Sequence, residues 1–525
     1  GATVKGNLDV IPQPQEIVLA RDTTPFIIDR STTIVYPATN EKMHRTADFL
    51  ATFIKEMTGT EIRVSDKEKS SNAIILAVDS TMGHPEGYKL QITPEKVLLT
   101  GGSEAGVFYG IQTIHKALPI LKDGKVAAAL PAGTVTDFPR FRYRGFMIDV
   151  GRHFFPVSYL KQMIDLMALH NINYFHWHLT EDQGWRIEIK KYPKLTEIGS
   201  KRDSTIIDWE TKKFDGKPHS GFYTQDEARE IVRYAADRFI TVVPEIDLPG
   251  HTTAALASYP ELGCTGGPYK VLCSFGVFPD VLCAGNDQTL QFTKDVLDEI
   301  MDIFPSEYIH IGGDECPKSR WEKCPKCQAK IKELGIKALP KHSKENQLQT
   351  YFMSELEKEI NAHGRRMLGW DEVLEGGLTP NSTIMSWRGI QGGIEAARQH
   401  HDVIMTPIQR LYFSNPRINK MTGFEWMNRV YNFEPVPAEL TDAEKKFVIG
   451  TQGCIWTEWT ADSTKMEWQI LPRMAALSEI QWTLPEHKNF ERFMERLPEM
   501  LKIYSSLDYG YREDVFAADT LKTHK

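Results

Sequence analysis

Two adjacent carboxylates, Asp314 and Glu315, are the residues of this chain best placed to do chemistry. They follow an apolar run at residues 308–311 and a Gly-Gly pair. An apolar strand that bends at glycine and ends in acids is how a barrel strand presents catalytic groups at its C-terminal end. The alternative is that the two acids begin a helix, since Asp and Glu favour the first helical turn. The rest of the chain favours the catalytic interpretation.

Polar and aromatic side chains also stand at or just beyond other segments that are predicted to be strands. They are Arg144 and Asp149; His176, His178, Glu181 and Asp182; Glu245, Asp247 and His251; Trp370, Asp371 and Glu372; Trp387; Tyr412; and Trp456 and Glu458. Packing alone does not call for tryptophans beside carboxylates at the end of a barrel strand. The repetition therefore predicts an active site at this face of the protein.

The residue types indicate a sugar as the ligand. Trp370, Trp387 and Trp456 can wall a pocket with flat apolar faces, which match the faces of a pyranose. Charged groups such as Arg144 and Glu458 can form paired hydrogen bonds with the hydroxyls at its edge. No Gly-rich phosphate loop or lysine cluster is evident, so a sugar is favoured over a nucleotide. Each tryptophan taken alone is equally compatible with a core position.

The spacing of the two acids limits the mechanism. Glycoside cleavage usually needs two carboxylates, about 5–5.5 Å apart for retention and about 6.5–9.5 Å apart for inversion. Neighbouring side chains on an extended backbone point apart, so Asp314 and Glu315 are not expected to act as acid and nucleophile on one bond. We expect one acid to act on the leaving oxygen and the other on a group of the substrate.

The elements that must position these residues form a repeating strand-then-helix pattern from about residue 141. Eight such units predict a parallel (β/α)8 TIM barrel as the catalytic domain, over residues 139–525. The predicted strands begin at Phe146, Tyr174, Ile240, Tyr308, Met367, Ile384, Val403 and Val448. One helix over residues 465–482 is expected to close the barrel, and another over residues 490–507 to pack on its outside.

Residues 1–138 are predicted to form a separate small α/β domain that carries no chemistry. Alternating apolar segments and two helical segments, at residues 43–57 and 106–118, lie in this region. Residues 119–140 contain several Pro and Gly residues and are predicted to be a linker between the domains.

Composition narrows the classes of function. The chain has 525 residues, of which 41% are hydrophobic and 25% charged, and its formal net charge is −8. These values are those of an ordinary globular protein with two or more domains. The absence of charge runs argues against nucleic acid or an anionic membrane as a partner. No apolar run approaches the roughly 20 residues of a membrane span.

The seven cysteines are too few for a disulfide scaffold in a chain of this size. Cys324-Pro-Lys-Cys327 resembles half of a zinc knuckle, but no second Cys/His pair follows at a usable spacing, so no metal site is predicted. Cys264 and Cys283 bracket a Gly-rich loop and are candidates for a disulfide in an oxidising compartment. No cofactor is predicted.

Several long motifs, in this order along the chain, resemble those of glycoside hydrolase family 20, the β-N-acetylhexosaminidases. They are the segments 144–154 (RGFMIDVGRHF), 176–186 (HWHLTEDQGWR), 244–251 (PEIDLPGH), 310–315 (HIGGDE) and 456–458 (WTE). The resemblance covers nearly the whole chain, including the small N-terminal domain. It implies a TIM barrel enzyme that removes terminal β-linked N-acetylglucosamine or N-acetylgalactosamine from glycans. It also implies export to the periplasm, the cell surface or the medium, although the chain begins Gly-Ala-Thr without a signal peptide.

The family resemblance implies substrate-assisted retention, an exception to the two-carboxylate rule. Glu315 would be the general acid and then the base. Asp314 would bind the acetamido N–H while the substrate's own carbonyl, held by Tyr412, attacks C1 and forms an oxazoline intermediate. The remaining roles would fall to Trp370, Trp387 and Trp456 around the acetamido group and ring, Arg144 and Glu458 on the ring hydroxyls, and His251 with Glu181, Asp182 and Asp247 in a polar network behind the acids. A desolvating pocket is expected to raise the pKa of Glu315, so that it is protonated near neutral pH.

One segment departs from the family pattern. After Tyr412 the family usually has a hydrophobic residue and then an acid near O6 of the sugar, whereas this chain has Phe413 and Ser414, with Arg417 close by. Loss of a carboxylate from that edge predicts that the enzyme accepts or prefers 6-O-sulfated N-acetylglucosamine. The alternative is loop drift, with O6 held by water.

Two other classes remain as alternatives. His176 and His178 lie on one face of a strand end and, with His251 and Asp247, are a plausible metal site of a TIM barrel amidohydrolase. A non-catalytic carbohydrate-binding protein is the third interpretation, although such a protein has no need of Asp314 beside Glu315 over a tryptophan-lined pocket.

Overall fold

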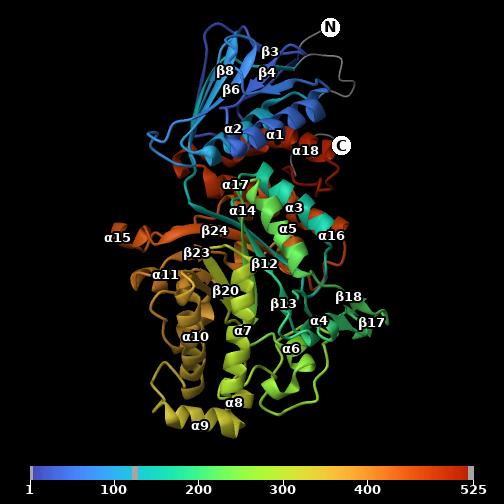
Figure 1. The fold of residues 1–525 in the computed structure, drawn as a ribbon, viewed down its shortest axis with the longest axis vertical. Helices are drawn as coiled ribbons and strands as arrows, with labels where there is room; N and C mark the ends of the chain where they lie inside the picture. The colour runs from blue at the N-terminus through green and yellow to red at the C-terminus, as the bar shows by residue number, and fades with distance from the viewer. Residues whose placement is uncertain (1–3, 121–127, 518–525) are drawn as a thin grey trace.

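The computed structural model of this chain describes residues 4–120 and 128–517 and shows two domains (Figure 1). The N-terminal domain lies at the top of the figure and the larger barrel domain lies below it. The last helix, α18 (Phe490–Ser506), lies between them, and its Arg496 donates a hydrogen bond of 2.9 Å to the carbonyl of Val10. The C-terminal end of the chain therefore joins the two domains.

The N-terminal domain is built on a seven-stranded sheet of mixed direction. In spatial order its strands are β2 (Glu16–Leu19), β10 (Gly133–Asp137), β7 (Tyr88–Ile92), β8 (Lys96–Gly101), β6 (Ala73–Val78), β4 (Thr33–Val35) and β5 (Arg63–Ser65). A smaller sheet contains β1 (Val4–Lys5), β9 (Ala128–Leu130) and β3 (Phe26–Ile28). Helices α1 (Glu41–Thr58) and α2 (Glu104–Ala117) pack together on the side that faces the barrel (Figure 1).

Local sequence explains the limits of α1. The side chain of Asn40 accepts a hydrogen bond of 3.1 Å from the backbone N–H of Met43, which satisfies one of the free donors of the first turn. Gly59 ends the helix at φ 75°, a left-handed conformation that glycine adopts without steric cost. The helix buries one apolar face that includes Met43, Leu50 and Ile54.

The predicted linker at residues 119–140 is wrong for its second half. Residues 133–137 form β10, which pairs with both β2 and β7 inside the large sheet, and residues 128–130 form β9. Pro131 follows the end of β9 and Gly133 begins β10, so these residues mark strand ends and not a free linker. The first half of the predicted linker, at residues 121–127, lies outside the described residues.

The barrel is closed, as predicted, and all eight of its strands are parallel. They are β11 (Tyr143–Asp149), β12 (Tyr174–His178), β19 (Thr241–Leu248), β20 (Tyr308–Gly312), β21 (Arg366–Trp370), β22 (Thr383–Ser386), β23 (Val403–Met405) and β24 (Val448–Ile455). Each coincides with a strand that the sequence predicts. Residues that alternate along these strands fill the interior with apolar side chains, including Tyr143, Met147, Leu368 and Ile404.

Helices of different lengths surround the barrel. The long ones are α3 (Val157–Leu169), α5 (Gln225–Ala236), α7 (Asp287–Ile303) and α10 (Lys344–Ala362), with α11 (Gln391–Arg398) and α14 (Gly423–Tyr431) further on. Between β21 and β22 the described chain has only a short 3-10 helix, η2 (Asp371–Gly376). The single helix predicted for residues 465–482 is wrong: it is two helices, α16 (Ser463–Ile470) and α17 (Arg473–Trp482), because Pro472 cannot continue a helix.

Within residues 4–120 and 128–517, no helix is both long and apolar enough to cross a membrane.

Candidate active site

A cavity of about 250 Å³ opens where the barrel strands end. Asp314 and Glu315 lie in its wall, directly after β20. The other lining residues are Arg152, Trp370, Trp387, Ile408, Tyr412, Ser414, Asn415, Pro416, Trp456, Glu458, Trp459, Thr460 and Gln469. The acid pair, the three tryptophans, Tyr412, Ser414 and Glu458 are therefore brought to one cavity, whereas Arg144 and Arg417 are not among its lining residues.

Two glycines place the acid pair. Gly312 and Gly313 have φ angles of 73° and 92°, in the region that favours glycine. A Cβ on Gly312 would lie 1.9 Å from Oδ1 of Asp247, so only glycine lets β20 approach β19 this closely. The chain then turns sharply, and Glu315 itself has φ 45°, a left-handed conformation that is costly for a residue with a side chain. Backbone strain of this kind is common at active sites and ligand-binding sites.

His251 connects the acid pair to further carboxylates. Its Nε2 lies 2.9 Å from Oε1 of Glu315 and 3.5 Å from Oδ2 of Asp314. Its Nδ1 lies 3.0 Å from Oδ2 of Asp182 and 3.1 Å from Oε1 of Glu181. The imidazole is almost fully buried, and like Glu315 it has a positive φ, 54°. The network predicted behind the acids is thus a histidine enclosed by carboxylates.

This enclosure controls the charge of Glu315. Burial lowers the pKa of His251, but the carboxylates of Glu181, Asp182 and Asp314 outweigh burial and hold it well above 6.5. Burial raises the pKa of Glu315, but the hydrogen bond and positive charge of His251 outweigh it, so this pKa is lower than its usual value. The prediction of a raised Glu315 pKa is therefore wrong, because it considered the pocket's desolvation and not the imidazolium. These directions favour a protonated His251 that donates its Nε2–H to an ionised Glu315 at 2.9 Å.

The second acid behaves in the opposite way. Burial raises the pKa of Asp314 to about 6, against the lowering effects of His251 and of the neighbouring Asp247. Asp247 is completely buried, and burial and the charge of Asp314 raise its own pKa well above the usual value. The raised pKa favours the neutral form of Asp247 beside Asp314. Oδ1 of Asp314 is buried without a hydrogen-bond partner in the described chain, which leaves it available to a donor on a ligand.

Aromatic rings form the walls of the cavity. Trp387 and Tyr412 are nearly parallel, with centroids 5.9 Å apart and an angle of 5° between the rings. Trp456 lies at a tilt between Tyr412 and Trp370, 5.7 Å from the first and 5.6 Å from the second. Trp370 is buried, and its indole N–H donates a hydrogen bond of 3.0 Å to Glu245, which fixes the ring orientation. The flat faces required for a sugar are present and held in place.

Glu372 has a supporting role that the sequence reasoning did not assign. One carboxylate oxygen accepts the backbone N–H of Glu315 at 2.8 Å, and the other accepts the indole N–H of Trp387 at 2.5 Å. The same side chain therefore fixes the strained backbone of the acid pair and one aromatic wall. Its position directly after β21 was noted from the sequence, but its two partners follow other strands of the barrel.

The arginine of the cavity is Arg152. Its guanidinium lies 3.1 Å from Asp149, 3.3 Å from Glu181 and 3.8 Å from Glu458, and 5.3 Å above the ring of Trp456. Arg152 and Glu458 thus form a charged pair at one edge of the cavity. Burial raises the pKa of Glu458, and the charge of Arg152 opposes this shift.

The prediction that Arg144 binds substrate is corrected by its position. Arg144 is at the start of β11, the opposite end of the strand from the cavity, and is completely buried. It donates to both carboxylate oxygens of Glu86, at 3.2 and 2.8 Å, and packs between the rings of Tyr109 and Trp482. Arg144 joins the two domains. Both arginines lie in the same motif, residues 144–154. Their roles differ because Arg144 is near the start of β11 and Arg152 lies beyond its end, at the cavity.

Ser414 and Arg417 occupy different environments in the structure. Ser414 lines the cavity, and its hydroxyl accepts the backbone N–H of Trp456 at 3.2 Å. Arg417, on the short helix α13 (Pro416–Asn419), is exposed and is not among the lining residues. Arg417 therefore does not place its charge in the cavity wall beside Ser414.

The histidines considered for a metal site are engaged with carboxylates. Nε2 of His176 and Nδ1 of His178 both lie 2.7 Å from Oε1 of Glu245, and Nε2 of His178 lies 2.6 Å from Glu181. Burial lowers the pKa of His178, but Glu245 and Glu181 raise it to about 10, so this ring carries protons on both nitrogens. Each ring nitrogen of His178 therefore already has a carboxylate partner.

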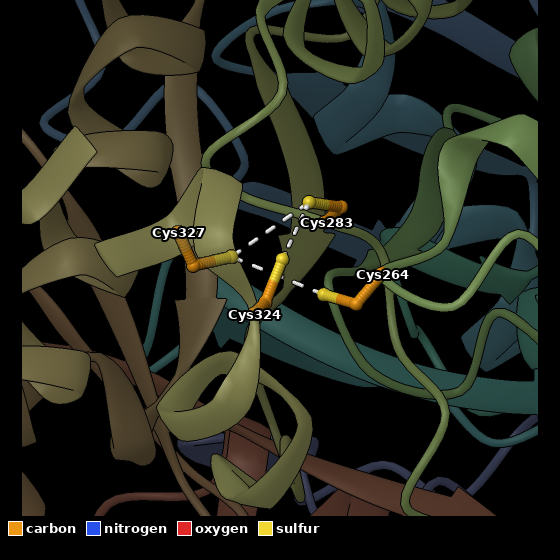
Figure 2. Close-up of side chains that lie close together, drawn as sticks. All are labelled: Cys264, Cys283, Cys324 and Cys327. Atoms are coloured by element: carbon orange, nitrogen blue, oxygen red, sulfur yellow. Dashed lines mark hydrogen bonds between the residues drawn. The ribbon is translucent and has the colours of Figure 1, made fainter. Parts of the chain in front are cut away.

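Four cysteines converge in the barrel domain, which the sequence reasoning did not predict. Cys264 and Cys283 approach Cys324 and Cys327, so the second pair needed for a knuckle comes from earlier in the chain (Figure 2). All four are free thiols in the structure, so the Cys264–Cys283 disulfide is not formed there.

A strained acid pair over a tryptophan-lined cavity, at the C-terminal end of a TIM barrel, is the arrangement typical of the active site of a barrel enzyme. The family model described as glycosyl hydrolase family 20, catalytic domain, matches residues 141–485, and that of glycosyl hydrolase family 20, domain 2, matches residues 7–138. The chain belongs to glycosyl hydrolase family 20.

Relatives and solved structures agree with this assignment. A beta-hexosaminidase of Porphyromonas gingivalis is 42% identical over 503 residues, which cover 93% of this chain and 62% of that protein. One from Vibrio furnissii is 34% identical over 443 residues, 82% of this chain and 71% of the relative. The structure of the family 20 beta-N-acetylhexosaminidase of Streptomyces coelicolor superimposes with a TM-score of 0.82 at 29% identity, over 97% of this chain and 99% of that one. The chain thus spans somewhat less than two thirds of the Porphyromonas relative.

Proposed function

We propose that this chain is an exo-acting β-N-acetylhexosaminidase that retains anomeric configuration by substrate-assisted catalysis. The observation that carries the proposal is the division between the two neighbouring acids. Glu315 lies 2.9 Å from Nε2 of His251, whereas Asp314, which lines the same cavity, has a buried oxygen with no hydrogen-bond partner in the described chain. One acid is suited to the leaving oxygen and the other to a hydrogen-bond donor of the substrate.

Each step of the reaction has a group in this site. One proton passes from His251 to Glu315 and from Glu315 to the glycosidic oxygen as the bond between that oxygen and C1 breaks. The substrate's acetamido oxygen, held by the Tyr412 hydroxyl, forms a bond to C1. Asp314 accepts the acetamido N–H and stabilises the positive charge of the oxazolinium ion. Water then attacks C1 and gives a proton to Glu315. The bond between C1 and the acetamido oxygen breaks, which opens the oxazoline ring and releases the sugar.

The rest of the cavity fits one sugar residue. Its volume of about 250 Å³ lies just below the range of typical ligand pockets, which is about 300–1,000 Å³. The buried Trp370 lines the cavity, and we infer that it limits the depth to one terminal sugar of a chain. Arg152 and Glu458 are placed to bind hydroxyls of the terminal ring. This arrangement supports exo action on a terminal β-linked N-acetylhexosamine.

The test is hydrolysis of a nitrophenyl β-N-acetylglucosaminide, with a thiazoline mimic of the oxazoline as inhibitor. We expect turnover that the thiazoline blocks competitively. Asp314→Asn should lose turnover with every leaving group, whereas Glu315→Gln should lose more with a poor leaving group than with nitrophenol, because a good leaving group needs less protonation. Turnover that is insensitive to the thiazoline would contradict the acetamide-assisted mechanism. A Glu315→Gln protein that binds and cleaves like the parent would favour a carbohydrate-binding role.

A finer proposal is that the site accepts 6-O-sulfated N-acetylglucosamine. It is supported by Ser414, a neutral residue of the cavity wall where the family pattern has an acid. Arg417 does not line the cavity. The sulfate group would therefore be accepted because no carboxylate repels it, and not because a positive charge attracts it. We expect the ratio of rates on sulfated and plain aryl substrates to fall at least tenfold in Ser414→Asp. Equal ratios in parent and variant would refute a role for this position.

We also propose that the enzyme works outside the cytoplasm, where glycan substrates are found. Fractionation of cells that express the full-length gene would test this, with activity expected in the periplasm, cell surface or medium. Activity confined to the cytoplasm would overturn it.

A further inference from the structure

Four thiols from three segments of the barrel domain meet at one point (Figure 2). Cys264 follows the 3-10 helix η1 (Pro260–Leu262), and Cys283 precedes α7. Cys324 separates α8 (Ser319–Lys323) from α9 (Pro325–Glu333), and Cys327 lies in the first turn of α9. The sulfur of Cys283 is 3.7 Å from those of Cys324 and Cys327, and the sulfurs of Cys264 and Cys327 are 3.9 Å apart.

These distances are those of a tetrahedral thiolate site. Zinc binds cysteine sulfur at about 2.3 Å in tetrahedral geometry, so the sulfurs of a site with four cysteine ligands lie about 3.8 Å from one another. All four sulfurs here lie within 4.8 Å of one another. A disulfide instead needs a sulfur–sulfur distance of about 2.05 Å, and Cys283 is equally close to two partners. The arrangement is that of four ligands around a centre and not of two bonded pairs.

The surroundings also suit thiolates. Cys283, Cys324 and Cys327 are buried, and Cys264 is partly so. Cys324 is the N-cap of α9, and Cys327 is in its first turn, where the helix dipole favours negative charge. A Cβ on Gly285 would lie 2.4 Å from the Cα of Cys327, so glycine at 285 allows the Cys283 loop to approach α9 this closely.

The cluster joins the two loops that carry the acid and its histidine. The loop after β19 carries His251 and continues through residues 263–286, which are all described and contain no helix or strand, only an isolated bridge between Gly263 and Leu282. Loops longer than about 12–15 residues without helix or strand are uncommon and are usually either functional or disordered. The loop after β20 carries Glu315 and runs directly into α8 and α9.

The fixed loop in turn reaches the cavity. The backbone N–H of Leu272 donates to the carbonyl of Asp182 at 3.1 Å, and Phe275 packs edge-on against the cavity residue Trp459, with ring centroids 5.3 Å apart. A link between the β19 loop and α9 therefore restrains both sides of the hydrogen bond between His251 and Glu315.

We propose that Cys264, Cys283, Cys324 and Cys327 bind one structural Zn²⁺ ion, which holds the loops after β19 and β20 together. The ion has no open position for substrate, since four protein ligands complete its tetrahedron. It is a positioning element, distinct from the acid pair, and its presence does not depend on the proposed hydrolytic activity.

Metal analysis of the purified full chain tests the proposal directly. We expect about one equivalent of zinc per chain, and about one Co²⁺ per chain with the visible spectrum of tetrahedral cobalt thiolate after exchange. Cys327→Ser should lose the zinc and the cobalt spectrum. Cys273→Ser is the matched control, because Cys273 lies in the same loop outside the cluster, and it should keep both.

Three results would overturn the proposal: less than a tenth of an equivalent of zinc in parent protein refilled under reducing conditions, a disulfide among the four cysteines in the active protein by mass spectrometry, or zinc retained by Cys327→Ser. Should Cys327→Ser fail to fold, the parent's zinc content and cobalt spectrum decide without it. Stability gives a second measurement. Removal of the metal by a strong chelator should lower the melting temperature of the parent and leave that of folded Cys327→Ser unchanged.

Discussion

Replacement of Arg144 and Arg152 by Met separates two roles that the sequence places in one motif. Methionine keeps an unbranched apolar stem of similar length and removes the guanidinium. Arg144→Met should destabilise the fold and leave catalysis in the folded protein intact, because Arg144 contacts Glu86, Phe141 and Asn171 far from the cavity. Arg152→Met should lower catalysis, because Arg152 lines the cavity beside Glu458.

The magnitudes follow from the contacts. Removal of one partner from a buried ion pair costs about 3–5 kcal/mol, since the other charge is left uncompensated. Unfolding entropy is about 2.1 cal/mol/K per residue, so over 525 residues this loss lowers Tm by about 3–5 °C if the chain unfolds cooperatively. Two charge-assisted hydrogen bonds to substrate are worth about 3–6 kcal/mol together, so Arg152→Met should lower kcat/KM by about 10²- to 10⁴-fold.

Both variants are assayed with the aryl substrate at 25 °C, well below the expected melting temperatures, alongside differential scanning calorimetry. Arg152→Met also unpairs Asp149 and Glu181, so its Tm is expected to fall too, and only kcat/KM separates the variants. The reasoning is refuted if folded Arg144→Met loses more than tenfold in kcat/KM, or if Arg152→Met keeps the parent value.

The pH profile of kcat/KM should rise through about pH 6 as Asp314 ionises and fall only well above pH 6.5, where the His251–Glu315 pair loses its proton. His251→Gln removes the imidazolium that lowers the Glu315 pKa, so the falling limb should move to lower pH; an unmoved limb would contradict a proton supplied by His251. The pKa of His251 is raised on folding, so its contribution to the free energy of unfolding is complete below about pH 6.5. This contribution is lost as the pH rises through the pKa of the folded state. Urea unfolding of the parent and of His251→Gln at several pH values measures it. Glu372→Gln has one acceptor oxygen for the two donors Glu315 and Trp387, so kcat should fall about tenfold or more with little change in Tm, and an unchanged kcat would remove its positioning role.

Much of the architecture was predictable because barrel strands are signalled locally. Each strand is a short apolar run followed by polar residues, and each is long enough to be found without knowledge of its neighbours, as at residues 308–312 and 448–455. Errors fell where a local signal was ambiguous. Pro472 splits a predicted helix. Residues 133–137 form a strand despite the nearby Pro131 and the initial Gly133, because pairing with β2 and β7 outweighs their weak local preference.

The sequence by itself determined the barrel, the acid pair and the aromatic walls, since catalytic groups must follow the ends of strands and these ends are adjacent in sequence to the residues they carry. Only the tertiary structure decided which arginine faces the cavity, because Arg144 and Arg152 differ by which end of β11 they occupy. It also decided the charge of Glu315, which depends on an imidazole 64 positions earlier, and the meeting of four cysteines from separate loops. Charge and coordination depend on distances through space, and a linear order of residues does not contain these distances.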